Sequence, residues 1–435
     1  MKKIIVAHAV ISLISFSQSV ISQEVSIPDP ALRRIMIEAA NADPTQPLAA
    51  DDFVGITTLT LNGAFDVTNP NQETIVTDLR GIELAKNLSS LILTRQPIGS
   101  LDFSILEALE FLRTVNIVKP KDESSTPDFS GLFLPNLTHL TLESRPVESF
   151  DFLSGLPGLE GLHLTGVTTP TLTIPENLQQ LKRLQIDGAS PLSELNLAGP
   201  FNQLEELVIG EHPGLSIHLP DTLPELRELT LAVPGQHGVI DWLSRGPSLP
   251  KLEKIRISNG SFTSLHLKNL PSLAHVEITH SDMQELHCEG SFPQLTDLII
   301  NKNELLRIDL DGSFPSLKNL LASENIFREL TIPQDATQLA IIDVRGVDPN
   351  FLSLPQSVDL NSLIIVGFAK ESITQYGGGP SLQLNADGQL ELSWQTGLLQ
   401  TAETVDGPWN DLPDATSPHL VDATAASVGF FRLRL

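Results

Sequence analysis

The chain has 435 residues, only 5% of them aromatic, and its 53 acidic and 27 basic residues give a net charge of −26 at pH 7. A chain of this length exceeds one ordinary globular core, and the abundance of leucine favours a repeat array. The negative charge argues against nucleic acid and anionic lipid surfaces as partners.

The first 22 residues have the features of a secretory signal peptide. Lys2 and Lys3 precede an apolar stretch, and Val20 and Ser22 fit the small-residue rule for cleavage after Ser22. A buried first helix is the alternative, but the charged start and the polar end favour the signal. Cleavage would remove two lysines and no acid, leaving a net charge of −28. No other apolar run reaches the roughly 18 residues that span a bilayer. We therefore expect an exported protein without a membrane span, either secreted or at the cell surface, with the periplasm also possible.

The next segment, ALRRIMIEAA at residues 31–40, has apolar residues at helical spacing. Leu32 and Ile35, with Met36 or Ala39, would form the apolar side of this helix. We expect that side to pack on the first unit of the array that follows.

A repeat fills residues 56–375. The pattern L-x-x-L-x-L, with Ile or Val allowed, recurs 14 times, mostly about 22 residues apart. Its last two apolar positions lie two residues apart, so they point to one face of a strand. Stacked units would form a parallel ladder in which each unit covers the apolar face of the next. The first positions are Ile56, Leu88, Leu112, Leu137, Leu159, Leu181, Leu204, Leu226, Leu252, Leu273, Leu295, Leu317, Leu339 and Leu360.

The second half of each unit also alternates between apolar and polar residues, as in TSLHLKN (263–269) and QELHCEG (284–290). This period predicts short strands or extended segments, and not full helices, on the back of the solenoid. The single cysteine, Cys288, falls where neighbouring units have Leu267 and Leu310. We therefore expect it to be a small core residue and not a nucleophile or a metal ligand.

The pattern resembles leucine-rich repeats, and its first third is similar to bacterial internalins. Residues 25–57 resemble the helical N-terminal cap of that family, which implies a cap over residues 23–55. In residues 76–104, Gly81, Leu84, Asn87 and Leu88 match the first internalin repeat in order. The resemblance covers about residues 25–370, and its internalin character fades after about residue 110. The asparagine that such repeats carry eight residues after the first leucine occurs only as Asn303 and Asn325.

The end of the chain differs from the repeats. YGGGPS (376–381) is expected to be a linker, and residues 382–435 alternate like short strands joined by turns. This segment resembles a C-terminal β-module found on exported proteins of Verrucomicrobia-like bacteria, which implies a cap or a surface-retention domain. We expect its tryptophans to form a small core rather than a sugar platform. The matching residues are Trp394, Leu399, Gln400, Gly407, Pro408, Trp409, Pro418 and the final FFRLRL.

The sequence contains no motif for catalysis or for cofactor binding. It has no G-x-S-x-G, H-E-x-x-H, P-loop or G-x-G-x-x-G. His139, His163 and His275 fall in different units and do not predict a metal triad. Asp309 and Asp311 are better explained as a solvated turn than as a calcium site. We therefore predict no catalytic residue, no metal, no cofactor and no enzymatic activity.

The predicted fold does provide a binding surface. It is mainly β, a leucine-rich repeat horseshoe of about 14 repeats of ~22 residues, with a small helical N-terminal cap and a small C-terminal β-module. Residues two, four and six after each first leucine should face its concave side, and we expect a ligand to bind among these residues. The candidate ligand-binding residues are Arg183, Gln185, Lys254, Arg256, His275, Glu277, Ile299 and Leu321.

Two properties of this surface limit the choice of ligand. It carries no Trp, Tyr or Phe before Phe368, and its charges are mixed, with Arg183, Lys254 and Arg256 as the cations that stand out. We predict an exported, non-enzymatic protein that binds a protein or polysaccharide partner through the concave face. The alternative is a structural envelope protein that its C-terminal module retains at the cell surface. The sequence leaves the oligomeric state open.

Overall fold

The computed structural model describes residues 25–63, 74–118, 127–143, 147, 149–188, 192–197, 199–210, 215–232, 237–347, 351–376, 381–384, 390–393, 398–402, 404, 407–417, 419–421 and 430–434. The predicted signal peptide, the centre of the predicted linker, Trp394 and Pro418 therefore lie outside the described residues.

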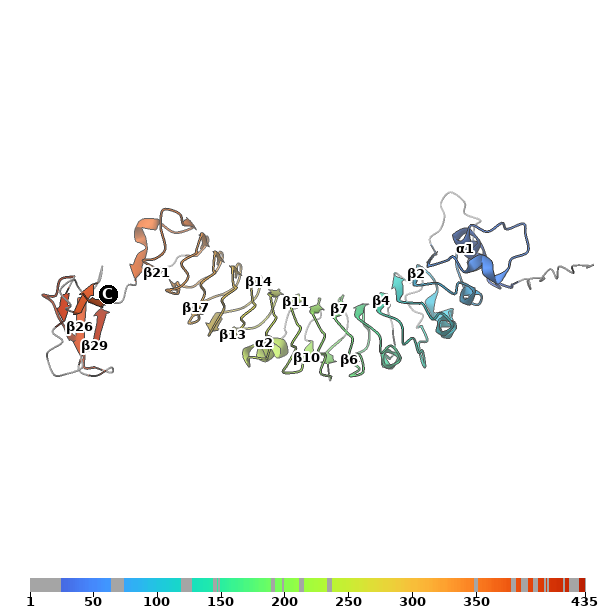
Figure 1. Cartoon of the computed structure of the whole chain (residues 1–435), viewed down its shortest axis with the longest axis horizontal. Coiled ribbons are helices and arrows are strands. Elements are labelled where there is room, and N and C mark those ends of the chain that lie inside the picture. The colour runs from blue at the N-terminus through green and yellow to red at the C-terminus, as the bar shows by residue number, and fades with distance from the viewer. Residues whose placement is uncertain are drawn as a thin grey trace, which may run out of the picture.

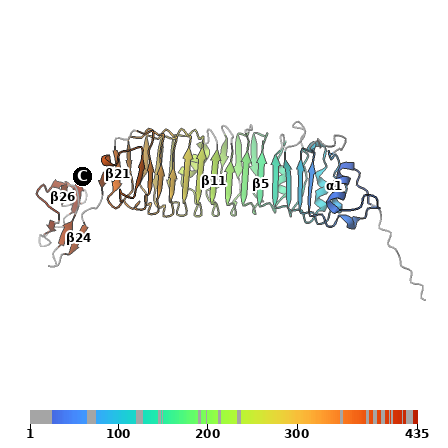
Figure 2. The same cartoon turned by 90° about the horizontal axis from the view of Figure 1, so that it is seen from above.

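Stacked repeats form an arc, and the inner side of the arc is one parallel sheet of 14 strands within the described residues (Figure 1). Seen from this concave side, the strands lie side by side along the whole arc (Figure 2). Each predicted unit contributes one strand, so the predicted mainly β leucine-rich repeat solenoid is confirmed. In sheet order the strands are β1 (Thr58–Asn62), β2 (Ser90–Thr94), β3 (Thr114–Val118), β4 (His139–Glu143), β5 (Gly161–Thr165), β7 (Arg183–Asp187), β9 (Glu206–Ile209), β11 (Glu228–Ala232), β12 (Lys254–Ser258), β14 (His275–Thr279), β16 (Asp297–Ile299), β18 (Asn319–Leu321), β20 (Ile341–Asp343) and β22 (Ile364–Val366).

Alternation along each strand explains why the sheet has one buried face. In β16 and β18, Leu298 and Leu320 are register partners and both are fully buried. Each such leucine contributes roughly 1.5–3 kcal/mol of transfer free energy. Phe292 and Phe314, which precede these strands, stack with ring centroids 5.1 Å apart. The near-identical segments 291–303 and 313–325 are therefore consecutive rungs of one continuous core.

In several rungs the turn after the strand is held by a polar side chain at the position where leucine-rich repeats carry asparagine. The buried Asn303 donates from Nδ2 to the carbonyls of Ile278 and Ile300, and its Oδ1 accepts from the Ser281 N–H at 2.9 Å. Asn325 repeats the Nδ2 bonds one rung later, and its Oδ1 accepts from the Leu305 N–H. At the same position in an early rung, the buried Gln96 accepts from the Val76 N–H at 2.9 Å. In this rung a glutamine thus satisfies the backbone where asparagine is missing.

The outer, convex side carries three three-stranded parallel sheets, as the alternating second halves predict. The prediction is wrong in two early units, whose second halves contain the 3-10 helices η4 (Phe103–Ala108) and η5 (Asp151–Gly155). It is also wrong in the unit from Leu226 to Lys251, where helix α2 (His237–Ser244) lies between β10 and β13. The 26-residue length of that unit accommodates the helix. The convex strands are β6 (Thr171–Ile174), β8 (Glu194–Leu197), β10 (Ser216–His218), β13 (Ser264–Lys268), β15 (Glu285–Glu289), β17 (Arg307–Leu310), β19 (Glu329–Thr331), β21 (Phe351–Pro355) and β23 (Thr374–Tyr376).

Helix α1 (Pro30–Ala40) covers the first rung. Its buried residues include Leu32 and Met36, whereas Ile35 is half-buried and Ala39 is exposed. The N-cap residue Asp29 accepts from the Leu32 N–H and from the Thr77 N–H, which joins the helix to the first repeats. Short 3-10 helices complete the solenoid, at η1 (Ala50–Phe53), η2 (Ile82–Leu84), η3 (Ile98–Ser100), η4 (Phe103–Ala108), η5 (Asp151–Gly155) and η6 (Lys370–Ser372).

The last rung is shifted from its predicted register. The pattern that starts at Leu360 aligns Leu363 with Ile342, but Ile342 pairs with Ile365. The backbone carbonyl of Asp359 accepts from the N–H groups of Ser362 and Leu363, and this turn makes the strand begin two residues later. A shift of two preserves which side chains face inward.

Beyond the last rung, the described part of the C-terminal segment forms two small antiparallel sheets. Trp409 is half-buried there, and the guanidinium of Arg432 lies 4.4 Å from the centroid of its ring. One sheet contains β24 (Ser381–Leu384), β25 (Leu390–Ser393) and β28 (His419–Val421), and the other contains β26 (Leu398–Ala402), β27 (Asn410–Asp411) and β29 (Phe430–Arg434).

Candidate functional site

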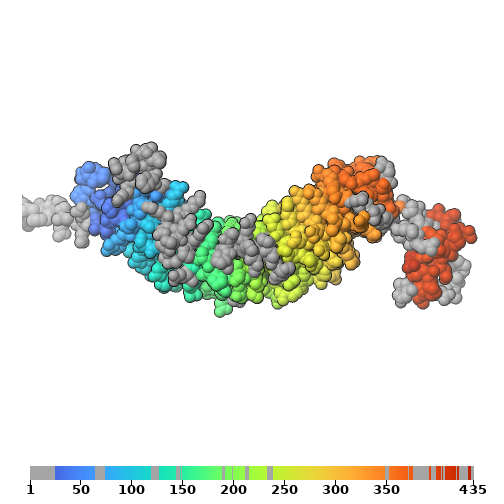
Figure 3. Space-filling model, turned by 180° about the vertical axis from the view of Figure 1, so that it is seen from behind, coloured from blue at the N-terminus to red at the C-terminus, as the bar shows by residue number. Residues whose placement is uncertain are grey.

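All the candidate binding residues lie on the outward side of the concave sheet, which the arc leaves open (Figure 3). They occupy strands from the middle of the sheet to near its C-terminal end. Arg183 and Gln185 belong to β7, Lys254 and Arg256 to β12, His275 and Glu277 to β14, Ile299 to β16 and Leu321 to β18.

The three conspicuous cations do not form one basic patch. Arg183 lies three strands from Lys254, or about 14 Å at ~4.8 Å per strand. Each cation also faces a glutamate on a neighbouring strand. The distances are 2.7 Å from Arg183 Nε to Glu206, 3.9 Å from Lys254 Nζ to Glu228 and 3.3 Å from Arg256 Nε to Glu277. Such exposed pairs contribute about 0–1 kcal/mol each, but they leave no block of unpaired positive charge.

Gln185 belongs to a small polar network that was not predicted from the sequence. Its Nε2 donates to Asp187 at 2.6 Å, and the same carboxylate lies 3.0 Å from His163 Nε2 on β5. Thr165 lies 3.2 Å from the same imidazole nitrogen. These groups satisfy one another across two strands.

His275 lies between two carboxylates. Its Nε2 is 3.6 Å from Glu277 and its Nδ1 is 4.0 Å from Asp297. Nε2 is buried and has no hydrogen-bond partner among the described residues. Burial opposes ionisation of Asp297, but hydrogen bonds from Thr296 and Asn319, with His275 nearby, lower the pKa of that carboxyl.

The predicted apolar pair extends into a longer stripe. Ile299 and Leu321 are register partners, and Ile341 and Ile364 pair on the next two strands. Leu321 and Ile341 are diagonal neighbours, a relation that brings side chains within reach of one another. We call these four residues the apolar stripe. Ile364 is 57% exposed, and the other three are half-buried. The sequence already indicated this extension, because Ile341 and Ile364 are apolar residues at outward strand positions.

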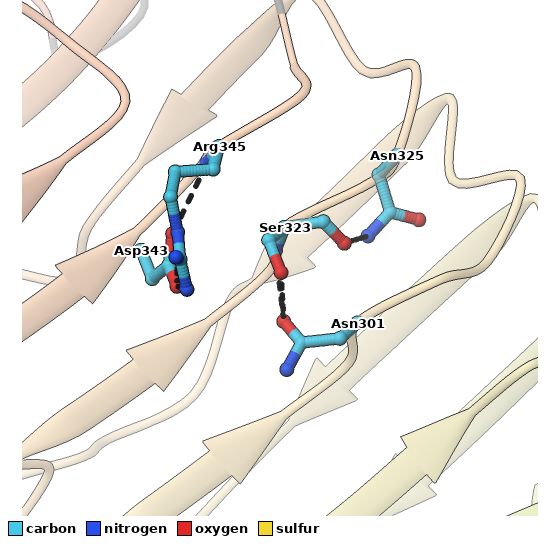
Figure 4. A network of polar contacts seen from close by, with 5 residues as sticks. All are labelled: Asn301, Ser323, Asn325, Asp343 and Arg345. Carbon is cyan, nitrogen blue, oxygen red and sulfur yellow. Dashed lines mark hydrogen bonds and ion pairs between the residues drawn. The ribbon is translucent and has the colours of Figure 1, made fainter.

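Polar groups with internal partners flank the stripe (Figure 4). Arg345 donates to both carboxylate oxygens of Asp343, and this hydrogen bonding lowers the pKa of Asp343. Asn301 accepts from the Ser323 N–H at 2.8 Å and from its hydroxyl at 2.9 Å. These two polar pairs beside the stripe are therefore bonded within the chain.

A hollow of about 230 Å³ opens on the same face around Gly161. Among the predicted residues, only Arg183 lines it. The sequence signal was the glycine itself, which takes an outward strand position that holds a side chain in every other repeat.

Cys288 and the pair of His287 and Asp309 are of the residue types that support catalysis or metal binding, and they lie away from the concave face. Cys288 is 1% exposed in β15, next to Leu267 and Leu310 in register, so the predicted core role is confirmed. Burial raises the pKa of its thiol to about 12. On the convex side, His287 Nδ1 lies 2.7 Å from Asp309. No group of three or more His, Cys, Asp or Glu side chains within the described ranges is placed to hold a metal ion. No helix in the described part of the chain has the length and apolar character to cross a membrane.

Parts of this chain are similar to known proteins in sequence or in fold. No protein-family model matches the chain. A curated protein named Roc-COR-CHAT protease, from an unknown prokaryotic organism, is 29% identical over 177 residues, which is 39% of this chain and only 16% of that protein.

Among solved structures, internalin InlF from Listeria monocytogenes aligns with a TM-score of 0.42 and 16% identity, covering 79% of this chain and 96% of that one. InlP from the same species aligns with a TM-score of 0.38 and 16% identity, covering 61% and 69%. A chain of the Drosophila Toll–Spätzle complex gives a TM-score of 0.40 and 14% identity, covering 69% and 42%. The chain is a leucine-rich repeat solenoid similar to bacterial internalins.

Proposed function

We propose that this is an exported, non-enzymatic binding protein that holds a protein partner along its concave face. The apolar stripe carries the proposal. It places four apolar side chains on four consecutive strands of a face whose other strands are mainly polar. The stripe would span about 14 Å across the sheet, a size suited to the apolar anchor of a partner protein.

The surroundings of the stripe favour a protein over a glycan. Carbohydrate surfaces are commonly held by aromatic platforms, and the outward strand positions contain no aromatic residue. The neighbouring charges are paired with each other, so a partner need not replace their hydrogen bonds. The free energy of binding would then come from desolvating the stripe, with the ion pairs acting mainly on specificity.

Substitutions in the stripe test this function. The mature chain, residues 23–435, is used to capture partners from extracellular protein extracts, and the affinity of each identified partner is then measured. Leu321→Ser and Ile364→Ser should each weaken binding about tenfold or more, because each removes roughly 1.4 kcal/mol or more of apolar contact.

Ile92→Ser is the matched control, since Ile92 is a half-buried outward residue of the same sheet near its other end. Its affinity should equal that of the unchanged chain. Equal losses for all three variants, or binding to glycans alone, would contradict the proposal.

The C-terminal segment supports a second role, retention at the cell surface. Its two antiparallel sheets are built separately from the parallel ladder, and its resemblance to a module of Verrucomicrobia-like exported proteins suggests an envelope address. In this alternative the solenoid is a spacer. Export itself is proposed from residues 1–22.

The likeness to a protein named a protease does not change the proposal. The match spans 16% of that protein, so its activity has no necessary connection with the matched repeats. The one cysteine of this chain is buried with a raised pKa, which is the opposite of an activated nucleophile.

A further inference from the structure

The hollow around Gly161 exists because one strand position lacks a side chain. Gly161 lies on β5, between His139 of β4 and Arg183 of β7 in register. A Cβ added at this position would meet the His139 ring at 2.7 Å, so the imidazole now lies over the glycine. The complete lining is His139, Glu160, Gly161, Lys182, Arg183, Glu205 and Glu206.

The lining of the hollow has three carboxylates and two cations, so one carboxylate has no opposite charge to balance it. Lys182 Nζ lies 2.9 Å from Glu160, and Arg183 Nε lies 2.7 Å from Glu206. Within each of these pairs, the positive and the negative charge neutralise each other. The exposed Glu205 side chain makes no hydrogen bond and no ion pair within 4 Å among the residues that the structure describes, although it lies near enough to Lys182 to help raise the pKa of that ammonium group. The hollow therefore carries a net negative charge when His139 is neutral.

We propose that this hollow accepts a lysine or arginine side chain of the protein partner, an inference that rests on the proposed function. The aliphatic stem would lie beside the His139 ring, in the space that opens because Gly161 has no side chain, and the cationic head would reach the carboxylate of Glu205. Long basic side chains combine such an apolar stem with a charged tip. The hollow is open to solvent, so the head group keeps part of its hydration and the cost of burying a charge stays small.

The hollow and the apolar stripe would act on one partner at separate points. From β5 to β16 is six strands along the sheet, or about 29 Å at ~4.8 Å per strand. The stripe would supply affinity, whereas the hollow would select partners with a basic residue at this distance from their apolar anchor.

The test uses the mature chain, residues 23–435, and a library of synthetic peptides of randomised sequence with Lys, Arg, norleucine or Glu at the central position. Peptides with Lys or Arg should bind about fivefold more tightly than those with norleucine, the size expected of one exposed charge pair. Gly161→Val should abolish this preference, because its side chain fills the hollow. Glu205→Gln should reduce the preference, and added salt should reduce it in the unchanged chain.

Two variants control for surface and charge. Thr114→Val places the same side chain at the equivalent position of β3, and Glu304→Gln removes an exposed carboxylate outside the hollow. Both should keep the preference for basic peptides. Valine suits a strand better than glycine does, but the His139 ring must turn away because an added Cβ would lie 2.7 Å from it. A melting temperature of Gly161→Val within a few degrees of the unchanged chain would show that the variant is folded.

The outcomes separate the two proposals. Peptides that bind through Leu321 and Ile364 without any preference for Lys or Arg would overturn the role of the hollow alone. A preference that survives Gly161→Val would do the same. Absence of all peptide binding, together with partner capture that is insensitive to Leu321→Ser, would overturn the protein-binding function as well.

Discussion

At the scale of single residues, Cys288 offers a direct test of the core. A thiol reagent at mildly alkaline pH should not label it in the folded chain and should label it fully in concentrated guanidinium. The reason is that the side chain is 1% exposed and its thiol has a pKa raised from about 9 to about 12. Rapid labelling of the folded chain would show an accessible thiolate and reopen a nucleophilic role.

The same group gives the stability a definite pH dependence. Because the folded state holds the thiol proton more tightly, the stabilisation is complete below the ordinary pKa of about 9 and is lost as pH rises toward about 12. The slope is at most ~1.4 kcal/mol per pH unit for one proton. Cys288→Ala should lack this part of the alkaline loss, so denaturant titrations of both chains across this range isolate it.

Residue pairing across strands is the part of the candidate site that could not be predicted. Arg183 and Arg256 were recognisable as outward cations, because alternation determines the face of a strand. Their partners, Glu206 and Glu277, belong to the following units in the chain. The register between units depends on how each intervening turn is built. The position of Glu205 beside Gly161 could not be predicted for the same reason.

At the scale of elements, helix α2 should be a stability centre of the convex side. Trp242 is 1% exposed, and its indole N–H donates to the Pro220 carbonyl at 3.0 Å. Trp242→Ala should lower the free energy of unfolding by about 3–5 kcal/mol, as for other buried aromatic residues. Trp242→Phe should cost less, mainly the ~1–3 kcal/mol of a carbonyl left without its donor. Denaturant unfolding measures both.

Phe292→Ala serves as the control for Trp242, since Phe292 is also fully buried but packs in a rung without a helix. Its loss should be of similar size. A cost below about 0.5 kcal/mol for Trp242→Ala, the range of surface changes, would contradict the packing described for α2.

The concave strands could be predicted from the sequence, whereas helix α2 and the register of the last rung could not. The concave strands follow from leucines at near-constant spacing, because every rung needs the same inward pair. Helix α2 was missed because HGVIDWLS is a short apolar run, and such a run fits a strand or a helix equally well. The shift of the last rung was missed because Leu360, Leu363 and Ile365 preserve the repeat pattern even though the Asp359 turn moves the register.

At the scale of the whole molecule, the solenoid distributes its stability along the chain. Each rung contacts mainly its neighbours, so the ends matter more than any one interior rung. Helix α1 covers the first rung, and Asp29 ties it to Thr77. Phe368 and Ile373 pack on the core at the other end, before the C-terminal sheets begin. The solenoid thus has its own covering at both ends.

Removal of residues 377–435 separates binding from retention. The remaining solenoid should keep its melting temperature and its partner affinity, because the last core contacts come from residues before 377. If the C-terminal sheets hold the protein at the cell surface, the shortened chain should instead appear in the medium, as fractionation and immunoblotting would reveal.

Deletion of residues 25–53, which removes α1, is the control for loss of a cap and should cause unfolding or aggregation. If the shortened chain unfolds in the same way, the C-terminal sheets are part of the fold. If it stays folded and on the cells, retention belongs to the repeats, and the concave face is then the surface that meets the envelope.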